Sequence, residues 1–252
     1  MFDLRLIGAD VLKLRRRRGM LALCVVLTLG IVALMVIVAA IQHGASPLEY
    51  APAGGIITYR DMMFVLTLMM LVVGAIVGAT AGTQDLESGV FRDLAATGRS
   101  RLALFGSRIP AACAIVFPIA ALAAAAAAIS AIALAGGVPA PDAAAIFAAT
   151  AGVLSAGALA ATVSVGLAAL TGSKAAVIAT MLAFNLALAP LLSGTSLLGD
   201  ARQALPTNAI FRVGDGPNQG VEMGLITAIV VLLAWAAAAF AAGAWRTQAR
   251  EV

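Results

Sequence analysis

Long apolar stretches alternate with short polar segments along the 252-residue chain. A helix rises about 1.5 Å per residue, so roughly 20 residues cross a hydrocarbon layer about 30 Å thick. Six stretches reach that length without an internal charge, at approximately residues 20–41, 62–83, 109–135, 143–171, 175–198 and 223–245. The pattern predicts six transmembrane helices, because lipid offers no partner to an open backbone and the short alternating segments of a membrane barrel do not occur.

Composition agrees with this pattern: 62% of the residues are hydrophobic and only 11% are charged. A soluble domain of this length is nearer one quarter charged, so a water-soluble globule is excluded. The predicted fold class is an all-α integral membrane protein with a single transmembrane domain over residues 1–252. A secretory signal peptide is disfavoured, because the first apolar stretch is longer than such a signal and five more follow.

The distribution of Lys and Arg predicts the orientation of the chain. Placing the N-terminus in the cytoplasm puts 13 of the 16 basic residues inside, and leaves only Arg60, Arg202 and Arg212 outside. We therefore expect both termini to be cytoplasmic, in a multi-pass protein of a bacterial-type inner (plasma) membrane.

Residues 1–19 precede the first apolar stretch and have their own pattern. Leu4, Ile7, Val11 and Leu14 fall on one helical face, which predicts an amphipathic helix at the membrane interface. The basic run 15–18 is typical of a topology signal that also contacts anionic headgroups of membrane lipids. We expect no nucleic-acid partner.

Within the spans, small and polar residues are the candidates for close packing or for a substrate route. Gly74, Gly78 and Gly82 recur every four residues and so share one helix face. Tight helix packing is the interpretation we favour, and a face lining a substrate route is the alternative. Asn185 is the most polar residue inside a span, with helix packing or a pathway role as its two interpretations.

Several kinds of chemistry are missing from the sequence. The span interiors carry no ionisable residue, which disfavours an ion-coupled carrier. No G-x-S-x-G or H-E-x-x-H motif occurs, and His43, Cys24 and Cys113 do not form a zinc-binding set, so we predict no catalytic and no metal-binding residues. A disulfide between the two cysteines is disfavoured on the reducing side of the membrane. The P-loop motif G-x-x-x-x-G-K-[ST] is absent too, so ATP cannot bind here in the P-loop manner.

Two connecting segments are distinctive. In the internal loop 84–108, Gly89 can end one helix and residues 90–97 can form a short amphipathic helix suited to docking a soluble partner. The alternative is a solvated loop that enforces topology. In the external segment 199–222, which follows Pro190 and the run 193–196, we expect the fifth helix to break and part of the chain to re-enter the membrane.

The internal loop resembles the first cytoplasmic loop of ABC-2-type permeases, the membrane subunits of ATP-binding cassette exporters. Their pattern is acidic-x-Gly-Thr, a basic residue, a Leu-rich turn, a Pro and a Ser-x-Arg-like ending. The matching residues here are Glu87-Ser88-Gly89-Val90, then Arg92 and Leu94, then Thr97-Gly98-Arg99-Ser100-Arg101, with Val90 in place of Thr and Gly98 in place of Pro. Residues 12–17 are similar to the basic elbow helix of that family, and residues 205–209 resemble its external Leu-Pro segment.

This resemblance implies a permease that works as a pair, either a homodimer or a heterodimer with a related permease. Each copy would engage one of two cytoplasmic ABC ATPase subunits, which would hold ATP and magnesium. The residues implied in ATPase coupling are Asp85, Glu87, Gly89, Phe91, Arg92, Leu94, Arg99 and Arg101. The implied substrate route lies between the copies near the first, second and fifth spans, with the candidates Thr28, Met35, Thr67, Met70, Thr180 and Asn185 and the three glycines of the second span.

Two other function classes remain open from the residues alone. One is a secondary carrier or channel, since sodium sites can be built from backbone carbonyls and hydroxyls. The other is an intramembrane enzyme or an assembly scaffold. Of the three, the ATP-driven permease agrees best with the charged internal loop and with the absence of both a P-loop and buried charges.

Overall fold

The structure is a computed structural model that describes residues 4–87, 100–216 and 221–249. Within these ranges every regular element is a helix and no strand occurs. Six helical segments are long and apolar enough to cross a membrane, namely Arg18–Ala45, Gly55–Asp85, Arg101–Ala133, Ala143–Thr171, Lys174–Gly194 and Leu225–Ala249. The prediction of an all-helical chain with six candidate membrane spans is confirmed.

Three of the six spans consist of more than one helical segment. The first contains α2 (Arg18–Val25), the π-helix η1 (Val26–Gly30) and α3 (Ile31–Ala45), and the third contains α6 (Arg101–Gly106) and α7 (Arg108–Ala133). The fifth contains α9 (Lys174–Leu182), the π-helix η2 (Ala183–Leu188) and α10 (Ala189–Gly194). The others are α4 (Gly55–Glu87), α8 (Ala143–Thr171) and α12 (Leu225–Ala249).

The helix α4 is longer than the apolar stretch that predicted it. The stretch covers residues 62–83, whereas the helix starts at Gly55 and ends at Glu87. The polar residues near its ends, such as Arg60 and Asp85, can be part of a helix as apolar residues can. Their charged side chains are unfavourable in the hydrocarbon layer, however. The hydropathy pattern therefore predicted only the part of α4 that is apolar enough to lie in lipid, and not the full length of the helix.

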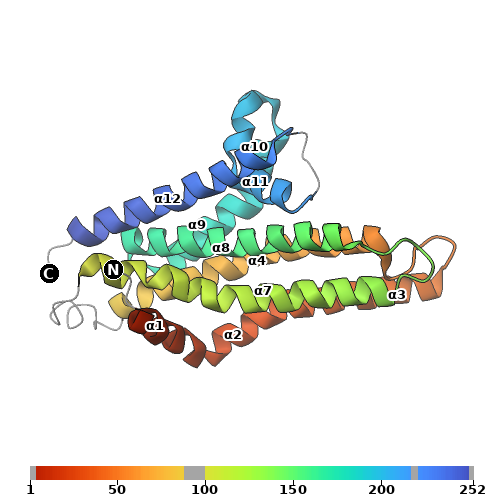
Figure 1. The fold of residues 1–252 in the computed structure, drawn as a ribbon, viewed down its shortest axis with the longest axis horizontal. Coiled ribbons are helices and arrows are strands. Elements are labelled where there is room, and N and C mark those ends of the chain that lie inside the picture. The colour runs from red at the N-terminus through yellow and green to blue at the C-terminus, as the bar shows by residue number, and fades with distance from the viewer. Residues whose placement is uncertain (1–3, 88–99, 217–220, 250–252) are drawn as a thin grey trace.

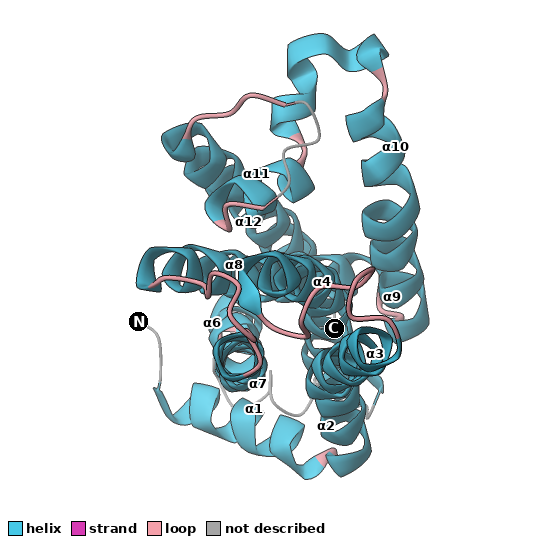
Figure 2. Ribbon diagram, turned by 90° about the vertical axis from the view of Figure 1, so that its right-hand side faces the viewer, coloured by secondary structure: helices cyan, strands magenta, loops and turns pink. Residues whose placement is uncertain are grey.

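The long helices α4, α7 and α8 run side by side, and α1 (Leu4–Arg16) lies across one end of this bundle (Figures 1 and 2). The end of α12 lies at the same end of the bundle as α1 (Figure 1). Leu14 of α1 is fully buried, whereas Leu4 and Leu12 are exposed. The helix α1 thus packs against the bundle by one part of its surface only.

The pair α4 and α8 forms the centre of the fold, with α7 packed on both and α12 packed on α8. The three glycines of α4 face α8. A Cβ atom on Gly74 would lie 2.6 Å from the carbonyl oxygen of Gly157, and one on Gly78 would overlap the backbone of Ala161. One on Gly82 would overlap the side chain of Ala168. The stripe therefore allows backbone-to-backbone contact, which favours packing over a route-lining role for these glycines.

Burial divides the spans into a central and a peripheral set. The second and fourth spans are mostly buried, while the first, fifth and last are mostly exposed. Their exposed side chains are large and apolar, for example Leu34, Ile37 and Ile41 on α3 and Ile226, Ile229 and Leu233 on α12. An apolar exposed surface of this extent requires lipid or another apolar surface around it.

The segment between the fifth and last spans folds back along the bundle. The fifth helix ends at Gly194, within the region where we expected a break. Most of the predicted external loop 199–222 is helical: the 3₁₀-helix η3 (Ser196–Ala204) leads into α11 (Pro206–Val213), which packs on α8 and α12. In Figure 1, α10 and α11 lie beside the middle of the long helices and not at their far ends.

Side-chain hydrogen bonds hold this fold-back segment together. The amide of Asn208 donates to the carbonyl of Arg202 (2.8 Å), and its oxygen accepts from the Ser193 hydroxyl (3.1 Å). The indole of Trp235 on α12 donates to the carbonyl of Ala204 (2.9 Å). Asn208 thus links α10, η3 and α11 through both ends of one side chain.

The close contact between α4 and α8 makes the effect of a larger residue predictable. We expect Gly78→Leu to prevent normal assembly, and Gly78→Ala to destabilise the fold by roughly 1–3 kcal/mol, because even one methyl group meets the Ala161 backbone. Thermal unfolding and gel filtration in detergent measure this. Gly44→Leu is the matched control, since no atom lies within 4 Å of a Cβ there. A Gly78→Leu protein as stable as this control would contradict a buried glycine face.

Candidate functional site

The predicted ATPase-coupling residues lie at or near the internal loop. Asp85 lies in the last turn of α4 and is buried, Glu87 ends that helix, and Arg101 begins α6. The other predicted coupling residues, Gly89, Phe91, Arg92, Leu94 and Arg99, lie outside the described residues. The structure therefore describes the base of the loop, where the chain leaves α4 and enters α6 and α7.

Asp85 is held between two cations at this base. Its Oδ1 accepts from Lys13 Nζ at 2.9 Å, and its Oδ2 accepts from Arg108 Nη2 at 3.1 Å. Lys13 comes from α1 and Arg108 is the first residue of α7. One carboxylate therefore joins three helices.

Two further contacts extend this network, which we call the Asp85 cluster (Asp10, Lys13, Asp85, Ser107 and Arg108). Lys13 Nζ also donates to Asp10 Oδ1 at 3.1 Å, and the Ser107 hydroxyl donates to Asp10 Oδ2 at 2.8 Å. Arg108 Nη1 donates to the carbonyl of Gly82 at 2.8 Å. Among the described residues the cluster pairs two carboxylates with two cations, and charges that are paired and hydrogen-bonded cost less to bury than isolated ones.

Burial makes these contacts costly to lose. Asp10, Asp85 and Arg108 are 7%, 6% and 3% exposed. Burial by itself lowers the pKa of the Lys13 ammonium, but hydrogen bonds and charge from Asp85 and Asp10 outweigh it and raise that pKa above its ordinary value. Lys13 consequently stays charged at neutral pH, and the stability that its raised pKa reports is lost as the pH rises through that pKa.

The predicted pathway residues do not converge on one site within the chain. Thr28 and Met70 are fully buried among the helices, and Met35 lines a shallow cavity of about 460 Å³ against the segment after α3. Thr67 lines a second cavity, and Thr180 and Asn185 line a third. The first two of these cavities share Ile57 and Asp61 in their walls, whereas the third shares no described lining residue with either.

Two of these residues sit in the two π-helical segments. The Thr28 hydroxyl in η1 donates to the Cys24 carbonyl at 2.9 Å, and the Asn185 amide in η2 donates to the Met181 carbonyl at 2.8 Å. In each case the partner is four residues earlier, where the helical hydrogen-bond ladder changes register. Such π segments are frequent at functional sites, and these two lie in the exposed first and fifth spans.

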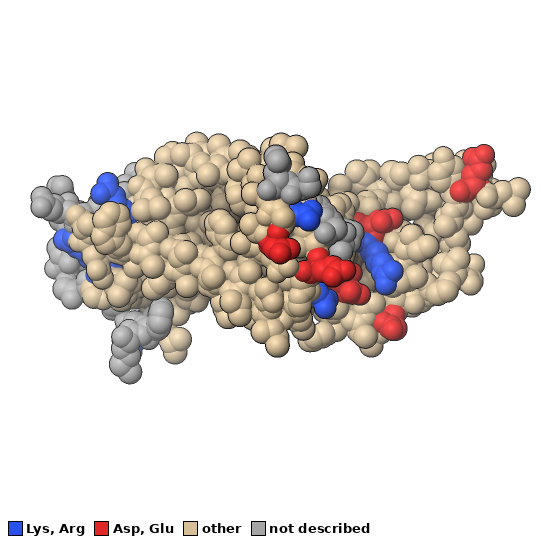
Figure 3. All heavy atoms as spheres, turned by 90° about the horizontal axis from the view of Figure 1, so that it is seen from above, with Lys and Arg blue, Asp and Glu red and all other residues tan. Residues whose placement is uncertain are grey.

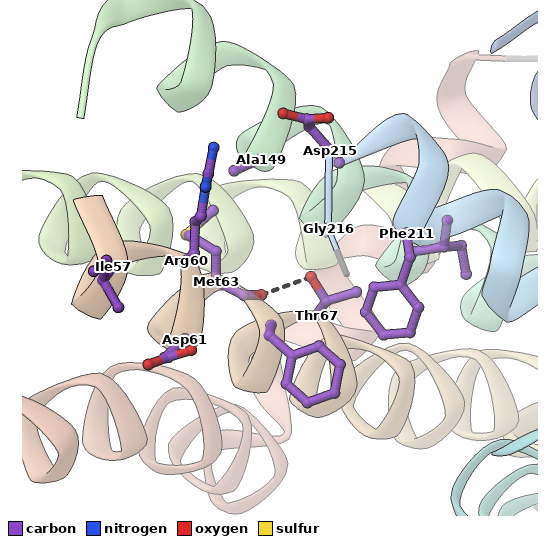
Figure 4. A pocket seen from close by; sticks show the side chains of 12 residues that line it. Ile57, Arg60, Asp61, Met63, Thr67, Ala149, Phe211, Asp215 and Gly216 are labelled. Carbon is purple, nitrogen blue, oxygen red and sulfur yellow. Dashed lines mark hydrogen bonds between the residues drawn. The ribbon is translucent and has the colours of Figure 1, made fainter. Parts of the chain in front are cut away.

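A cavity of about 680 Å³ lies between α4, α8 and the fold-back segment. Figure 4 shows Arg60 and Asp215 on one side of it and Asp61 on the other. Its wall contains Phe64, whose ring stacks on that of Phe211 with the centroids 5.1 Å apart. The cavity thus combines a charged rim with an aromatic and apolar interior.

A smaller cavity of about 200 Å³ is almost entirely apolar. Leu71, Leu159, Val163 and Trp235 line it together with Thr180 and Asn185. Phe184 and Trp235 bridge it with ring centroids 5.8 Å apart. The Asn185 side chain is the most polar group along its wall.

The surface view adds the distribution of charge. Seen from the side of α10 to α12, charged side chains gather around the fold-back segment, and most of the remaining surface is uncharged (Figure 3). The segment contributes Asp200, Arg202, Arg212, Asp215 and Glu222. Of the charged rim of the cavity in Figure 4, Asp215 belongs to this segment, and Arg60 and Asp61 belong to α4.

Comparison with known proteins leaves the family undecided. No protein-family model matches the chain, and no curated protein matches it. Among residues 4–87, 100–216 and 221–249, no group of three or more His, Cys, Asp or Glu side chains is placed to hold a metal ion.

Sequence reasoning missed most of the Asp85 cluster. Lys13 counted toward orientation and toward the elbow-helix resemblance, Arg108 counted only toward orientation, and Asp10 and Ser107 were given no role. Asp85 and Arg108 border apolar stretches, yet a residue's position along the chain does not reveal its partner. The one available signal was that an acidic residue at a helix end beside lipid needs a cation.

The Asp85 cluster generates a stability prediction. We expect Asp85→Asn to destabilise the protein by about 3 kcal/mol, because it leaves the buried Arg108 and the half-buried Lys13 without their shared carboxylate. In thermal unfolding this corresponds to a midpoint lower by about 5–10 °C. Glu49→Gln, an exposed carboxylate near the other end of the bundle, is the control. A midpoint equal to the control's would show that the cluster does not hold the three helices together.

Proposed function

We propose that this chain is the permease subunit of an ATP-driven ABC exporter of the ABC-2 type. The observation that supports it most is the Asp85 cluster, which joins α1, α4 and α7 at the base of the loop 84–108. Any force applied to that loop acts on three helices that are tied together. A loop that docks an ATPase and moves the spans has to be firmly attached to those spans, and the Asp85 cluster provides such an attachment.

The packing of α4 carries this argument into the membrane. Because α4 contacts α8 through its glycine face, a displacement at the end of α4 moves both central helices. A displacement of one helix is transmitted to its neighbour across a closely packed interface, because such an interface has few voids that could be compressed. The loop is thus connected mechanically to the centre of the bundle.

The energy source in this proposal lies outside the chain. The sequence has no P-loop, so two cytoplasmic ABC ATPase subunits would hold ATP and magnesium, and this chain would not be an enzyme by itself. The coupling helix of the loop would dock on them through Glu87, Phe91, Arg92 and their neighbours. The protein would lie in a bacterial-type inner membrane with both termini in the cytoplasm.

A second permease copy would complete the pathway, as a homodimer or with a related permease. The exposed first and fifth spans provide apolar surface for that contact. The pathway candidates Thr28 and Asn185 lie in the π segments of these spans, with their side chains buried inside the chain. The cavity with a charged rim and the Phe64–Phe211 pair would suit an amphipathic or lipid-like cargo on its way out.

Copurification tests the proposal directly. We expect the chain, expressed with its neighbouring genes, to copurify with an ATPase subunit, and the reconstituted complex to transport only when ATP is hydrolysed. A Walker-lysine variant of that ATPase is the control that should abolish transport. Transport by the chain alone without ATP, together with no bound ATPase, would overturn the proposal.

Charge reversal in the loop tests the coupling role separately. We expect Glu87→Lys and Arg92→Glu each to uncouple ATP hydrolysis from transport while leaving expression and dimerisation intact, because a docking face depends on charge complementarity. The measurement is substrate-stimulated ATPase activity beside transport in the same vesicles. Glu49→Lys, near the opposite end of the bundle, is the matched control. Full substrate stimulation in both loop variants would count against docking through these charges.

A further inference from the structure

Two cations from distant parts of the chain line one cleft at the end of the bundle where α1 lies. Arg17 connects α1 to α2, and Lys174 is the first residue of α9. The cleft has a volume of about 340 Å³, and its other lining residues are Gly19, Met20, Leu23 and Ile76. The fold brings these two basic residues together although 157 positions separate them in the sequence.

The charges of this cleft have no acidic partner among the residues that the structure describes. Neither Arg17 nor Lys174 forms an ion pair with a residue that the structure describes. Two carboxylates lie at the same end of the bundle, but both already form ion pairs. Asp10 is paired with Lys13, and Asp85 is paired with Lys13 and Arg108. Within residues 4–87, 100–216 and 221–249 no acidic residue lines the cleft, so Arg17 and Lys174 present two positive charges to a ligand there.

The rest of the cleft is apolar. Met20 and Leu23 of α2 and Ile76 of α4 form its wall, and Leu23 is 48% exposed at the surface of the bundle. A second cavity of about 500 Å³ shares Lys174 with the cleft and is also lined by Ala175 and Ile178 of α9. A charged rim above apolar helix surface suits an amphiphile whose head is anionic and whose tail is hydrocarbon.

We propose that this cleft is a binding site for an anionic phospholipid. Arg17 and Lys174 bind the headgroup phosphate, and the acyl chains follow the apolar surfaces of α2 and α9 beside Leu23 and Ile178. The site goes beyond the transport function proposed above and does not depend on it, since binding requires neither an ATPase nor ATP.

The experiment measures lipid binding to the full chain purified in detergent. The probes are phosphatidylglycerol, zwitterionic phosphatidylcholine and the soluble anion glycerol 3-phosphate. We expect phosphatidylglycerol alone to remain bound in native mass spectrometry and to raise the thermal unfolding midpoint. In Arg17→Gln/Lys174→Gln, the phosphatidylglycerol concentration for half-maximal stabilisation should rise at least about tenfold.

The control is Arg16→Gln/Arg246→Gln, which removes the same charge from exposed positions outside the cleft and should bind as the unmodified chain does. If the glutamine variant at the cleft does not fold, Arg17→Lys/Lys174→Arg keeps both charges and should retain the site. The proposal would be overturned if the control pair of substitutions weakened phosphatidylglycerol binding as much as the pair in the cleft does. Equal stabilisation by phosphatidylcholine or by glycerol 3-phosphate would overturn it as well, the latter by showing an anion site without a lipid.

Discussion

Contact between the backbones of α4 and α8 is the constraint on which the rest of the fold depends. Inside lipid, helices gain little from the hydrophobic effect, so their association relies on close van der Waals packing. Gly74 and Gly78 remove the side chains that would separate these two helices. The same device recurs where α12 meets α8, since a Cβ on Gly166 would overlap Ala239. The peripheral helices thus attach to a centre built from small residues.

The Asp85 cluster completes that frame at one end with a different kind of interaction. Packing of small residues is short-ranged and apolar, whereas the cluster joins α1, α4 and α7 through ion pairs with few alternative arrangements. Loss of the Asp85 carboxylate removes the ion pairs that Lys13 and Arg108 form with it, so this one side chain ties the ends of α1, α4 and α7 to one another. This rigidity explains why a loop that begins and ends there suits the coupling role proposed for it.

The remaining polar groups are distributed over separate regions. The charged rim of one cavity is formed by Arg60 and Asp61 of α4 with Asp215 of the fold-back segment, the π segments with Thr28 and Asn185 belong to the exposed first and fifth spans, and the Arg17 and Lys174 cleft lies at the same end as the Asp85 cluster. Among the described residues, the cavity with Thr180 and Asn185 shares no lining residue with the cavity at Arg60 or with the Arg17 and Lys174 cleft. A pathway between two copies is the arrangement that the proposed function requires.

The sequence alone determined the features that depend on near neighbours in the chain. Six apolar stretches of sufficient length predicted six spanning helices, glycines four residues apart predicted one small face on α4, and Pro190 with its following serines marked where the fifth span ends. Only the tertiary structure decided which distant residues meet. Lys13 and Asp85 are 72 residues apart, Asp10 and Ser107 are 97 apart, and Phe211 reaches Phe64 because the segment after the fifth span folds back. Hydropathy and spacing describe each helix separately, whereas these contacts depend on how the helices pack together.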